Sequence, residues 1–327
     1  MENIAVLMGG ISREREISLK SGRVIAQSLD PNRFNIFPVI IERDQWYHES
    51  NSGDRVQIDK NDFSLTIDGS KINFDCCYNS IHGTPGEDGL IQSYLELLNI
   101  PHTSSSSYAS AITFNKRDCL AVLKPWKIPT GIHQYINLES DYSIDNIIDQ
   151  VGLPCFVKAN RSGSSYGVSK VNRREEMQNS IDIAFDVDDE IIVESYLSGM
   201  EVSVGVYQLN NEIHILPPTE IVTETDFFDY EAKYNGKSQE ITPARLQDSQ
   251  IKELQELTRK IYQVLKMNGI ARADFIYHDN KPYFVEINSV PGMSKQSIIP
   301  QQVESAGLDF TDFLTSIIEN SIADRTV

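Results

Sequence analysis

The sequence predicts an α/β protein of two or three packed units, and three observations lead to that fold class. Apolar runs alternate with amphipathic segments through the first hundred residues, which is typical of a mostly parallel sheet. Two later segments, 200–222 and 270–288, alternate apolar and polar residues as antiparallel strand pairs do. The chain has 327 residues, 40% of them apolar, which is enough for several hydrophobic cores.

The first unit is predicted to span residues 1–105, to hold a parallel sheet with ligand loops at its strand ends, and to end in a serine-rich joint. Its expected elements, in order, are the strand NIAVLMGG (3–10), a helix over 11–29, the strand FNIFPVII (34–41), the strand FDCCYNSIHG (74–83) and a helix over 87–100.

The second and third units are predicted over 106–200 and 201–327. The second is expected to hold one long helix over 108–126 and strands near 128–136, 153–160 and 189–197. The third is expected to hold the antiparallel pair 200–222, a polar loop at 223–238, a helix over 248–269, the hairpin 270–288 and a last helix. A polar loop of that length is uncommon unless it is a lid or disordered.

Charge and cysteine usage exclude several classes of function. The net charge is −18 and the pI about 4.7, so the chain would be repelled by nucleic acid and by anionic membranes. No apolar run approaches the length of a membrane span, and MENIAVLMGG is interpreted as a first strand rather than a signal peptide. Cys76, Cys77, Cys119 and Cys155 lack metal or redox spacing, which favours buried, reduced thiols in the cytoplasm.

The stretch KANRSGSSYGVSK (158–170) follows an apolar strand with a loop of glycines and serines. Such a loop brings backbone N–H groups close to a phosphate, and Lys158 adds a cation at its start. The loop has neither the P-loop spacing nor G-x-G-x-x-G. By itself it fits either a phosphate cover or an ordinary flexible turn.

The hairpin 270–288 carries Asp274, Glu286 and Asn288, which are oxygen ligands of the kind that Mg²⁺ takes beside nucleotide phosphates. A three-residue loop at 279–281 is predicted, because it pairs residue 274 with 286 and residue 272 with 288. Arg272 then shares that face and could neutralise a phosphate or an oxyanion. A solvated polar face of an edge hairpin is the alternative. The opposite face is expected to be apolar, with Ala271, Ala273, Phe275, Tyr283, Val285 and Ile287.

Four other stretches carry candidate binding groups, each with a purely structural alternative. In EINSVPGMSKQS (286–297) the Gly292 N–H could form an oxyanion hole, and Ser297 could bind a carboxylate at a helix start. In GGISREREISLKSG (9–22) Glu14 could bind an amine, although i,i+4 charge pairs on a helix explain most of its charges. HGTPGEDG (82–89) contains His82, and a lone histidine is usually structural. DYEAKY (229–234) places a lysine and a tyrosine in the long polar loop.

Taken together, these stretches resemble the D-alanine–D-alanine ligases, which belong to the ATP-grasp superfamily. The resemblance covers almost the whole chain in the family's order. The motifs that carry it are GGISREREISLKSG, HGTPGEDGLIQSYLELLNIP, VKANRSGSSYGVSKV, VESYLSGMEVSVGV, FFDYEAKY, ARADF and EINSVPGMSKQSIIPQQ.

The resemblance implies that 106–200 and 201–327 are subdomains that grip ATP between antiparallel sheets. Two Mg²⁺ ions are implied, for which Mn²⁺ is expected to substitute. The implied metal ligands are Asp274, Glu286 and Asn288. The implied nucleotide contacts are Lys116, Lys158 and Lys233 at the phosphates, Glu194 and Leu197 at the adenine, and Glu201 at the ribose.

The resemblance also implies the substrate sites. Glu14, with His82 nearby, would hold the amino group of the first D-alanine, and Ser297 would hold the carboxylate of the second. Glu14, Ser164 and Tyr234 would form a triad that fixes the closed state. Arg272 and the Gly292 N–H would stabilise the oxyanion. The implied reaction joins two D-alanines through an acyl phosphate, for peptidoglycan precursors, in a homodimer.

The chain departs from the family pattern at four positions: Ala159 replaces Pro, Asn115 replaces Asp, His102 replaces Tyr and Ser289 replaces Thr. Ala159 is expected to loosen the start of the glycine loop. Related reactions with D-lactate, D-serine or another acceptor remain alternatives, but the lysine and tyrosine of DYEAKY favour an amine acceptor. A catalytically silent nucleotide sensor would need a broken metal site, whereas all its expected ligands are present.

Overall fold

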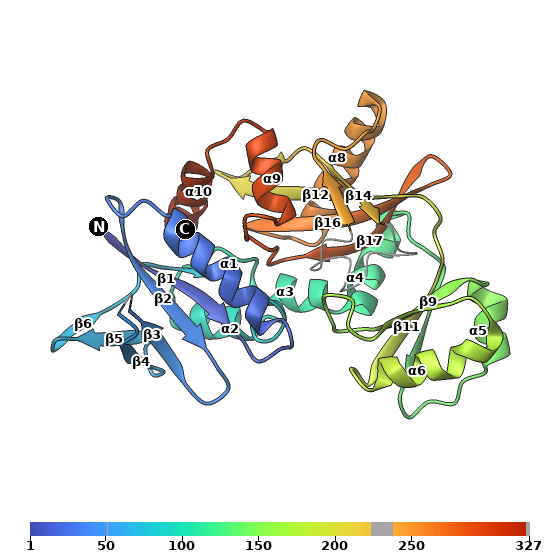
Figure 1. Ribbon diagram of the computed structural model, residues 1–327, viewed down its shortest axis with the longest axis horizontal. Helices are drawn as coiled ribbons and strands as arrows, with labels where there is room; N and C mark the ends of the chain where they lie inside the picture. Colours follow the sequence, from blue (N-terminus) through green and yellow to red (C-terminus); the bar gives the residue numbers. More distant parts are fainter. Residues whose placement is uncertain (51, 224–237, 325–327) are drawn as a thin grey trace.

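The computed structural model describes residues 1–50, 52–223 and 238–324. Three sheets follow one another along the chain, and helices pack against each of them (Figure 1). The predicted α/β class is confirmed, with parallel strands at the start and antiparallel sheets afterwards. The proposed division at residues 105 and 200 stays a prediction.

The first sheet has the order β6-β5-β4-β3-β2-β1-β7. β1 (Glu2–Gly9) pairs in parallel with β2 (Phe34–Ile41) and with β7 (Cys76–Asn79), as the sequence predicted. Four antiparallel strands that were not predicted extend this sheet: β3 (Trp46–Glu49), β4 (Arg55–Asp59), β5 (Ser64–Ile67) and β6 (Ser70–Ile72).

Both faces of β1 are buried, because helices cover both sides of the parallel strands. Ile4, Val6 and Met8 share a hydrophobic cluster with residues of α1 (Arg15–Ser28). Ala5 and Leu7 point to the other face, where they share a cluster with residues of α2 (Leu90–Leu97). This explains why β1 is an uninterrupted apolar run and not an alternating one.

The central sheet is antiparallel and has the order β10-β9-β11-β8. Helices α5 (Ile144–Val151) and α6 (Met177–Phe185) contribute Ile147 and Ile181 to the cluster that covers one of its faces. A 3₁₀ turn (Arg174–Glu176) precedes α6. The strands are β8 (His133–Asn137), β9 (Cys155–Ala159), β10 (Val168–Val171) and β11 (Glu190–Ser195).

The single helix expected over 108–126 is wrong. The structure has α3 (Ser107–Phe114), then α4 (Lys116–Leu123) and a 3₁₀ turn (Lys124–Trp126). Asn115 breaks the helix because its backbone is extended, with φ −91° and ψ 104°, and its side chain accepts a hydrogen bond from the Asp118 N–H at 3.0 Å. A short polar side chain that caps the backbone ends one helix and begins the next.

The C-terminal sheet has the order β15-β14-β12-β16-β17, and β13 pairs with β12 beside β14. Its strands are β12 (Met200–Leu209), β13 (Glu212–Ile215), β14 (Thr219–Thr223), β15 (Ser238–Ile241), β16 (Ile270–His278) and β17 (Lys281–Asn288). The helices of this part are α8 (Asp248–Val264), α9 (Ile298–Ser305) and α10 (Phe310–Ala323).

The register predicted for the β16–β17 hairpin is confirmed, but its predicted loop is wrong. Asp274 faces Glu286 and Arg272 faces Asn288, as expected. The turn has only two residues, Asp279 and Asn280, both with positive φ (49° and 61°), as a tight hairpin turn requires. The extra residue is instead taken up by a β-bulge after Asp274.

The bulge also changes which residues face the core. Phe284 pairs with Phe275, and both are buried in the core, while Val285 lines a cavity on the other side of the sheet. The expected apolar face, which included Tyr283 and Val285, is therefore wrong at its β17 end. Aspartate and asparagine tolerate positive φ, so DN forms a two-residue turn without glycine.

One hydrophobic cluster joins the two ends of the chain. It contains Val6 and Met8 from β1 together with Tyr207 from β12 and Phe313 and Leu314 from α10. In Figure 1, α10 accordingly lies beside α1 and not apart from the first sheet. The first and last parts of the chain thus share a core.

All four cysteines are free and buried, as predicted. Burial raises the pKa of each thiol, to about 12 for Cys119 and about 11 for Cys155. Among the described residues, no helix is both long enough and apolar enough to cross a membrane.

Candidate active site

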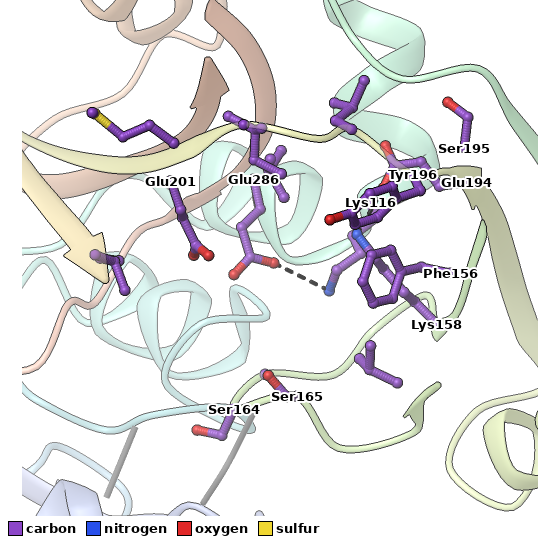
Figure 2. A pocket seen from close by; sticks show the side chains of 18 of the residues that line it. Lys116, Phe156, Lys158, Ser164, Ser165, Glu194, Ser195, Tyr196, Glu201 and Glu286 are labelled. Carbon is purple, nitrogen blue, oxygen red and sulfur yellow. Dashed lines mark hydrogen bonds and ion pairs between the residues drawn. The ribbon is translucent and has the colours of Figure 1, made fainter. Parts of the chain in front are cut away.

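A cavity of about 380 Å³ opens between the central sheet and the C-terminal sheet (Figure 2). Aromatic and aliphatic side chains, including Phe156, Tyr196 and Ile276, form part of its wall, and lysines and carboxylates form the rest. The sequence-predicted residues that line it are Lys116, Lys158, Ser164, Glu194, Leu197, Glu201 and Glu286. Residues far apart in sequence thus converge on one space with both apolar and charged walls.

Lys158 and Glu194 form a buried ion pair in the wall of the cavity. They come from β9 and β11, and Lys158 Nζ lies 2.7 Å from Glu194 Oε2. Burial alone would lower the pKa of Lys158, but the carboxylates of Glu194, Glu286 and Glu201 together more than offset this effect and raise the pKa above its usual value. Lys158 is therefore held as a cation at the cavity wall.

Lys116 is the first residue of α4, and the capping residue Asn115 positions it there. Its Nζ donates to the Ser162 carbonyl in the glycine loop at 2.7 Å and lies 3.7 Å from Glu286 Oε2, as the dashed line in Figure 2 marks. The Asn115 side chain also accepts from Asn160 Nδ2 at 2.9 Å. The helix break is thus what carries a second cation into the cavity.

Ala159 contributes a backbone hydrogen bond at the base of the glycine loop, and the expected loosening of the loop stays a prediction. Its backbone N–H donates to the Gly167 carbonyl at 3.1 Å and so closes the base of the loop 160–167. Proline, the residue expected at this position, has no N–H to donate. His102, another departure, pairs with Glu96 at 3.6 Å and does not line the cavity.

Asp274, Glu286 and Asn288 lie on one face of β16 and β17, as predicted. Asp274 is 7% exposed and accepts hydrogen bonds from Arg272 Nε (2.9 Å) and Nη2 (2.7 Å) and from Ser203 Oγ (2.6 Å). The Asn288 side-chain oxygen accepts from the Val290 N–H at 2.9 Å. The face offers two carboxylates and one amide oxygen. In the described part of the chain, no group of three or more His, Cys, Asp or Glu side chains is arranged to hold a metal ion.

Glu14 contacts Ser164, a residue that lines the cavity, as predicted for two members of the triad. Ser164 Oγ donates a hydrogen bond to Glu14 Oε1. Gly163 leaves room for this contact, since a Cβ there would lie 2.8 Å from Glu14 Oε2. Ser164 itself has a positive φ of 48°. Tyr234 and Lys233 lie outside the described residues, as does most of the predicted lid.

His82 and Glu87 are buried beside Glu14. His82 Nε2 lies 3.2 Å from Ser21 Oγ, and burial lowers the pKa of His82 although the Glu14 carboxylate opposes this. Glu87 Oε2 accepts from the Gly83 N–H at 2.7 Å. Burial, together with the Glu14 carboxylate, raises the pKa of Glu87 to about 8.

Ser21 connects this cluster to the loop after β17, because its Oγ also accepts from the Met293 N–H at 3.3 Å. In that loop, a Cβ on Gly292 would lie 2.8 Å from Ser297 Oγ, so the two residues are neighbours. Ser297 is the residue before α9, and its hydroxyl bonds Ser294 Oγ at 2.8 Å rather than capping the helix. A hydroxyl and the N–H groups of a helix start thus lie side by side.

Comparison with known proteins identifies the family. Residues 3–105 match the family model for the D-ala D-ala ligase N-terminus, and residues 126–319 match that for the D-ala D-ala ligase C-terminus. The chain belongs to the D-alanine–D-alanine ligase family. A relative from Flavobacterium johnsoniae named D-alanine--D-alanine ligase is 51% identical over 323 residues, which are 99% of this chain and 100% of the relative.

Solved structures of this family have the same fold. The D-alanyl-alanine synthetase A of Vibrio cholerae superposes with a TM-score of 0.88 at 30% identity, over 98% of both chains. The Bacillus anthracis D-alanine–D-alanine ligase complexed with ATP gives a TM-score of 0.80 at 26% identity, over 100% of this chain and 99% of that one. The resemblance read from the motifs, the fold and the enzyme class, a ligase, are therefore confirmed.

Reading the sequence missed two buried residues that contact or neighbour the candidate site residues. Glu87 was quoted within HGTPGEDG but received no function, and Ser203 was quoted within VESYLSGMEVSVGV in the same way. The signal for Ser203 was present, since it lies on the β12 face that carries Glu201, two residues earlier. What the sequence could not show is that β12 pairs with β16 so that Ser203 lies opposite Asp274.

Proposed function

We propose that this protein joins two D-alanines into D-alanyl-D-alanine at the expense of ATP, which becomes ADP and phosphate, for peptidoglycan precursor synthesis. The observation that carries the proposal is the convergence of Lys116, Lys158 and Glu286 on one cavity between two antiparallel sheets, in a chain of this ligase family. Cations and carboxylates around an apolar pocket suit a nucleotide triphosphate with its metal ions.

The nucleotide occupies the cavity of Figure 2. Its base lies against the aromatic wall at Glu194 and Leu197, and Glu201 receives the ribose hydroxyls. Lys116 and Lys158 contact the phosphates, and Lys233 reaches the γ-phosphate from a segment outside the described residues. All of these residues except Lys233 line the cavity, which supports their assignment.

Asp274, Glu286 and Asn288 hold two Mg²⁺ ions, for which Mn²⁺ substitutes. Two carboxylates and an amide are few ligands for two ions, but Mg²⁺ keeps several waters and takes phosphate oxygens in nucleotide sites. The three oxygen-bearing side chains fit that chemistry, since they share one face beside Lys116. Mg²⁺, when bound, offsets the repulsion between a carboxylate and a triphosphate.

The substrates lie at the mouth of the cavity. The carboxylate of Glu14, with His82 nearby, holds the ammonium of the first D-alanine, and Ser164 with Tyr234 completes the closure over it. Ser297 and the start of α9 hold the carboxylate of the second D-alanine. Arg272 and the Gly292 N–H face the reacting carbonyl between the two substrates.

The reaction follows from the electronic properties of a carboxylate, which is a poor electrophile. An oxygen of the first D-alanine carboxylate attacks the γ-phosphorus, and the bond to ADP breaks. The amine of the second D-alanine, after losing a proton, attacks the acyl phosphate carbonyl. Arg272 and the Gly292 N–H stabilise the resulting oxyanion, and the C–O bond to phosphate then breaks. Closure excludes water, which would otherwise hydrolyse the acyl phosphate.

Product analysis tests this function. The protein is incubated with ATP and Mg²⁺ and with D-alanine, with L-alanine, or with D-alanine plus D-lactate or D-serine, and the products are separated by chromatography. We expect the D-alanyl dipeptide and equimolar phosphate from D-alanine alone. A mixed product formed in preference to D-alanyl-D-alanine would overturn the acceptor assignment, and ATP binding without turnover would point to a nucleotide sensor.

The protein acts in the cytoplasm as a homodimer. Its four buried free thiols suit a reducing compartment.

The surface of α2 and α3 supports self-association, since three large apolar side chains are exposed there: Leu90 (59%), Leu97 (87%) and Tyr108 (68%). Light scattering should report twice the chain mass, and Leu97→Glu should halve it, whereas Leu138→Glu, at an exposed leucine elsewhere, should not. A wild-type protein that stays monomeric would contradict this assignment.

A further inference from the structure

Ser203 lies directly across the sheet from the candidate metal carboxylate. It is on β12, opposite Asp274 of β16, and its side chain is fully buried. Its Oγ donates a 2.6 Å hydrogen bond to Asp274 Oδ1. A serine hydroxyl has one proton to donate, so this bond uses the whole donor capacity of the residue.

The other donors to Asp274 come from Arg272, which contacts both carboxylate oxygens, at 2.9 and 2.7 Å. A guanidinium repels a divalent cation that approaches the same carboxylate, whereas a neutral hydroxyl does not. Arg272 also has a separate proposed task at the reacting carbonyl. The hydrogen bond from Ser203 can therefore persist when a cation binds to Asp274, whereas the contacts from Arg272 oppose the cation.

The backbone around Ser203 is held by a buried glutamine of α9. Gln302 Nε2 donates to the Ser203 carbonyl at 2.9 Å, and Gln302 Oε1 accepts from the Gly205 N–H at 2.9 Å. This is the point where β12 changes its partner from β14 to β13. The side-chain amide therefore takes the place of a strand peptide. A Cβ on Gly205 would lie 2.5 Å from Gln302 Oε1, so a larger residue there would have to displace the Gln302 side chain.

We propose that Ser203 is a positioning residue of the metal site: its hydroxyl holds the Asp274 carboxylate in the orientation that receives a divalent cation. Gln302 fixes Ser203 in turn and so connects the metal strand to α9, the helix that begins at Ser297. This proposal rests on the metal ligands assigned above. The contacts that orient metal ligands typically change metal affinity 10- to 100-fold.

Direct Mn²⁺ binding tests the proposal without requiring turnover. The whole protein is saturated with a non-hydrolysable ATP analogue, and free Mn²⁺ is followed by electron paramagnetic resonance, with the analogue alone as blank. We expect Ser203→Ala to weaken one enzyme-bound ion about tenfold. The turnover number of this variant should recover at high Mg²⁺, because Asp274 is still present and only its orientation is less well fixed.

Two comparisons separate positioning from a general loss of structure. Ser180→Ala removes a buried hydroxyl of α6 that donates to the carbonyl of Glu176, at the end of the preceding 3₁₀ turn, and it should leave Mn²⁺ binding unchanged. Ser203→Thr and Ser203→Val have nearly the same shape, and only the threonine keeps a hydroxyl. The threonine variant should bind Mn²⁺ about as the wild type does and more tightly than the valine variant, even if the alanine variant does not fold.

The outcomes distinguish this inference from the proposed function. Equal Mn²⁺ affinity in the wild type and Ser203→Ala, or in the threonine and valine variants, would overturn the role of Ser203 and leave the metal site standing. If the wild-type complex binds no Mn²⁺ beyond the analogue blank, or if Asp274→Asn leaves binding unchanged, the metal assignment itself fails.

Discussion

At the scale of single residues, charged side chains at the candidate site are buried together with their partners. Lys158 is held by Glu194, and Asp274 by Arg272 and Ser203. A buried ion pair contributes little net stability, but removing one partner leaves an uncompensated charge. At both places, removing a single partner should therefore cost more stability than the intact pair provides.

Lys158→Met should destabilise the ligand-free protein by about 3 kcal/mol, because Glu194 is then buried without its cation. Adding Glu194→Gln to it should recover part of this loss, since a neutral amide is less costly to bury. Urea denaturation of the single and double variants measures both effects. Lys252→Met, at an exposed lysine of α8, serves as control and should change stability by less than about 0.5 kcal/mol. A double variant less stable than Lys158→Met would contradict the explanation.

Glu87 should make stability depend on pH. Its pKa is about 8 in the folded protein, above the ordinary value of 4.5, so the folded state keeps a proton that the unfolded state loses. Its contribution is fully present below about pH 4.5 and is lost as the pH rises through 8. Glu87→Gln should remove this dependence, with a slope difference of at most about 1.4 kcal/mol per pH unit.

Urea denaturation between pH 5 and 8 measures that slope for the wild type and for Glu87→Gln. His82 acts in the opposite direction, because its lowered pKa makes stability rise with pH over the range where the unfolded histidine loses its proton. Comparing the two proteins removes most of the His82 effect. Glu256→Gln, at an exposed glutamate, should reproduce the wild-type slope. Parallel slopes for Glu87→Gln and the wild type would show that Glu87 is ionised at neutral pH.

At the scale of elements, two local departures from regularity position the candidate ligand-binding groups. The break between α3 and α4 puts Lys116 at a helix start facing the glycine loop. The bulge in β17 keeps Glu286 opposite Asp274 although the turn has only two residues. Neither feature follows from a periodic pattern, because each depends on a single residue whose backbone departs from helix or strand geometry.

Asn115→Ala should lower stability by about 1 kcal/mol through loss of the cap on α4, and it should raise the KM for ATP several-fold because Lys116 loses its fixed position. Thermal unfolding and initial rates measure the two effects. Ser143→Ala removes the cap of α5, away from the cavity. It should cost a similar amount of stability and leave the KM unchanged. Equal KM values for ATP in both variants would show that the Asn115 cap does not contribute to ATP binding.

Asn280→Gly should stabilise the protein by about 0.5 kcal/mol, because position 280 has φ 61°, which glycine adopts without a steric penalty. Asn280→Val should act in the opposite direction, since a β-branched residue is strained at positive φ. Urea midpoints of the three proteins give the order. If valine were tolerated as well as glycine, the two-residue turn would be wrong.

At the scale of the whole molecule, the beginning and the end of the chain form one core. Phe313 of α10 stacks edge-on against Tyr207 of β12 at 5.0 Å, in the cluster that also holds Val6 and Met8 of β1. Thr311 Oγ1 donates to the Ser28 carbonyl at the end of α1. Helix α1, which Glu14 precedes, and the sheet that carries Asp274 are therefore held in one core, as the proposed substrate sites require.

Phe313→Ala should lower the free energy of unfolding by about 3–5 kcal/mol, because the removed ring leaves a void in the cluster shared by β1, β12 and α10. It should also lower the protection of backbone amides against hydrogen exchange in both the first and the last part of the chain. Native-state hydrogen exchange should show the amides of β1 and β12 losing protection together. Ile181→Ala, in the separate cluster of α6 and the central sheet, should affect β9 and β11 but not β1. Unchanged protection of β1 in Phe313→Ala would mean that the two regions unfold independently.

The sequence by itself determined the family, the fold class, the parallel strands, the hairpin register and most candidate side chains. These depend on local signals: apolar periodicity, glycine and serine loops, and motifs whose spacing survives in one dimension. The tertiary structure decided how Glu14 meets Ser164, how Lys158 pairs with Glu194 and which strand faces Asp274. It also decided the helix break, the turn and the core shared by α1 and α10. Each of these results from competition among backbone hydrogen bonds, burial and charge between segments far apart in sequence, which no local pattern records.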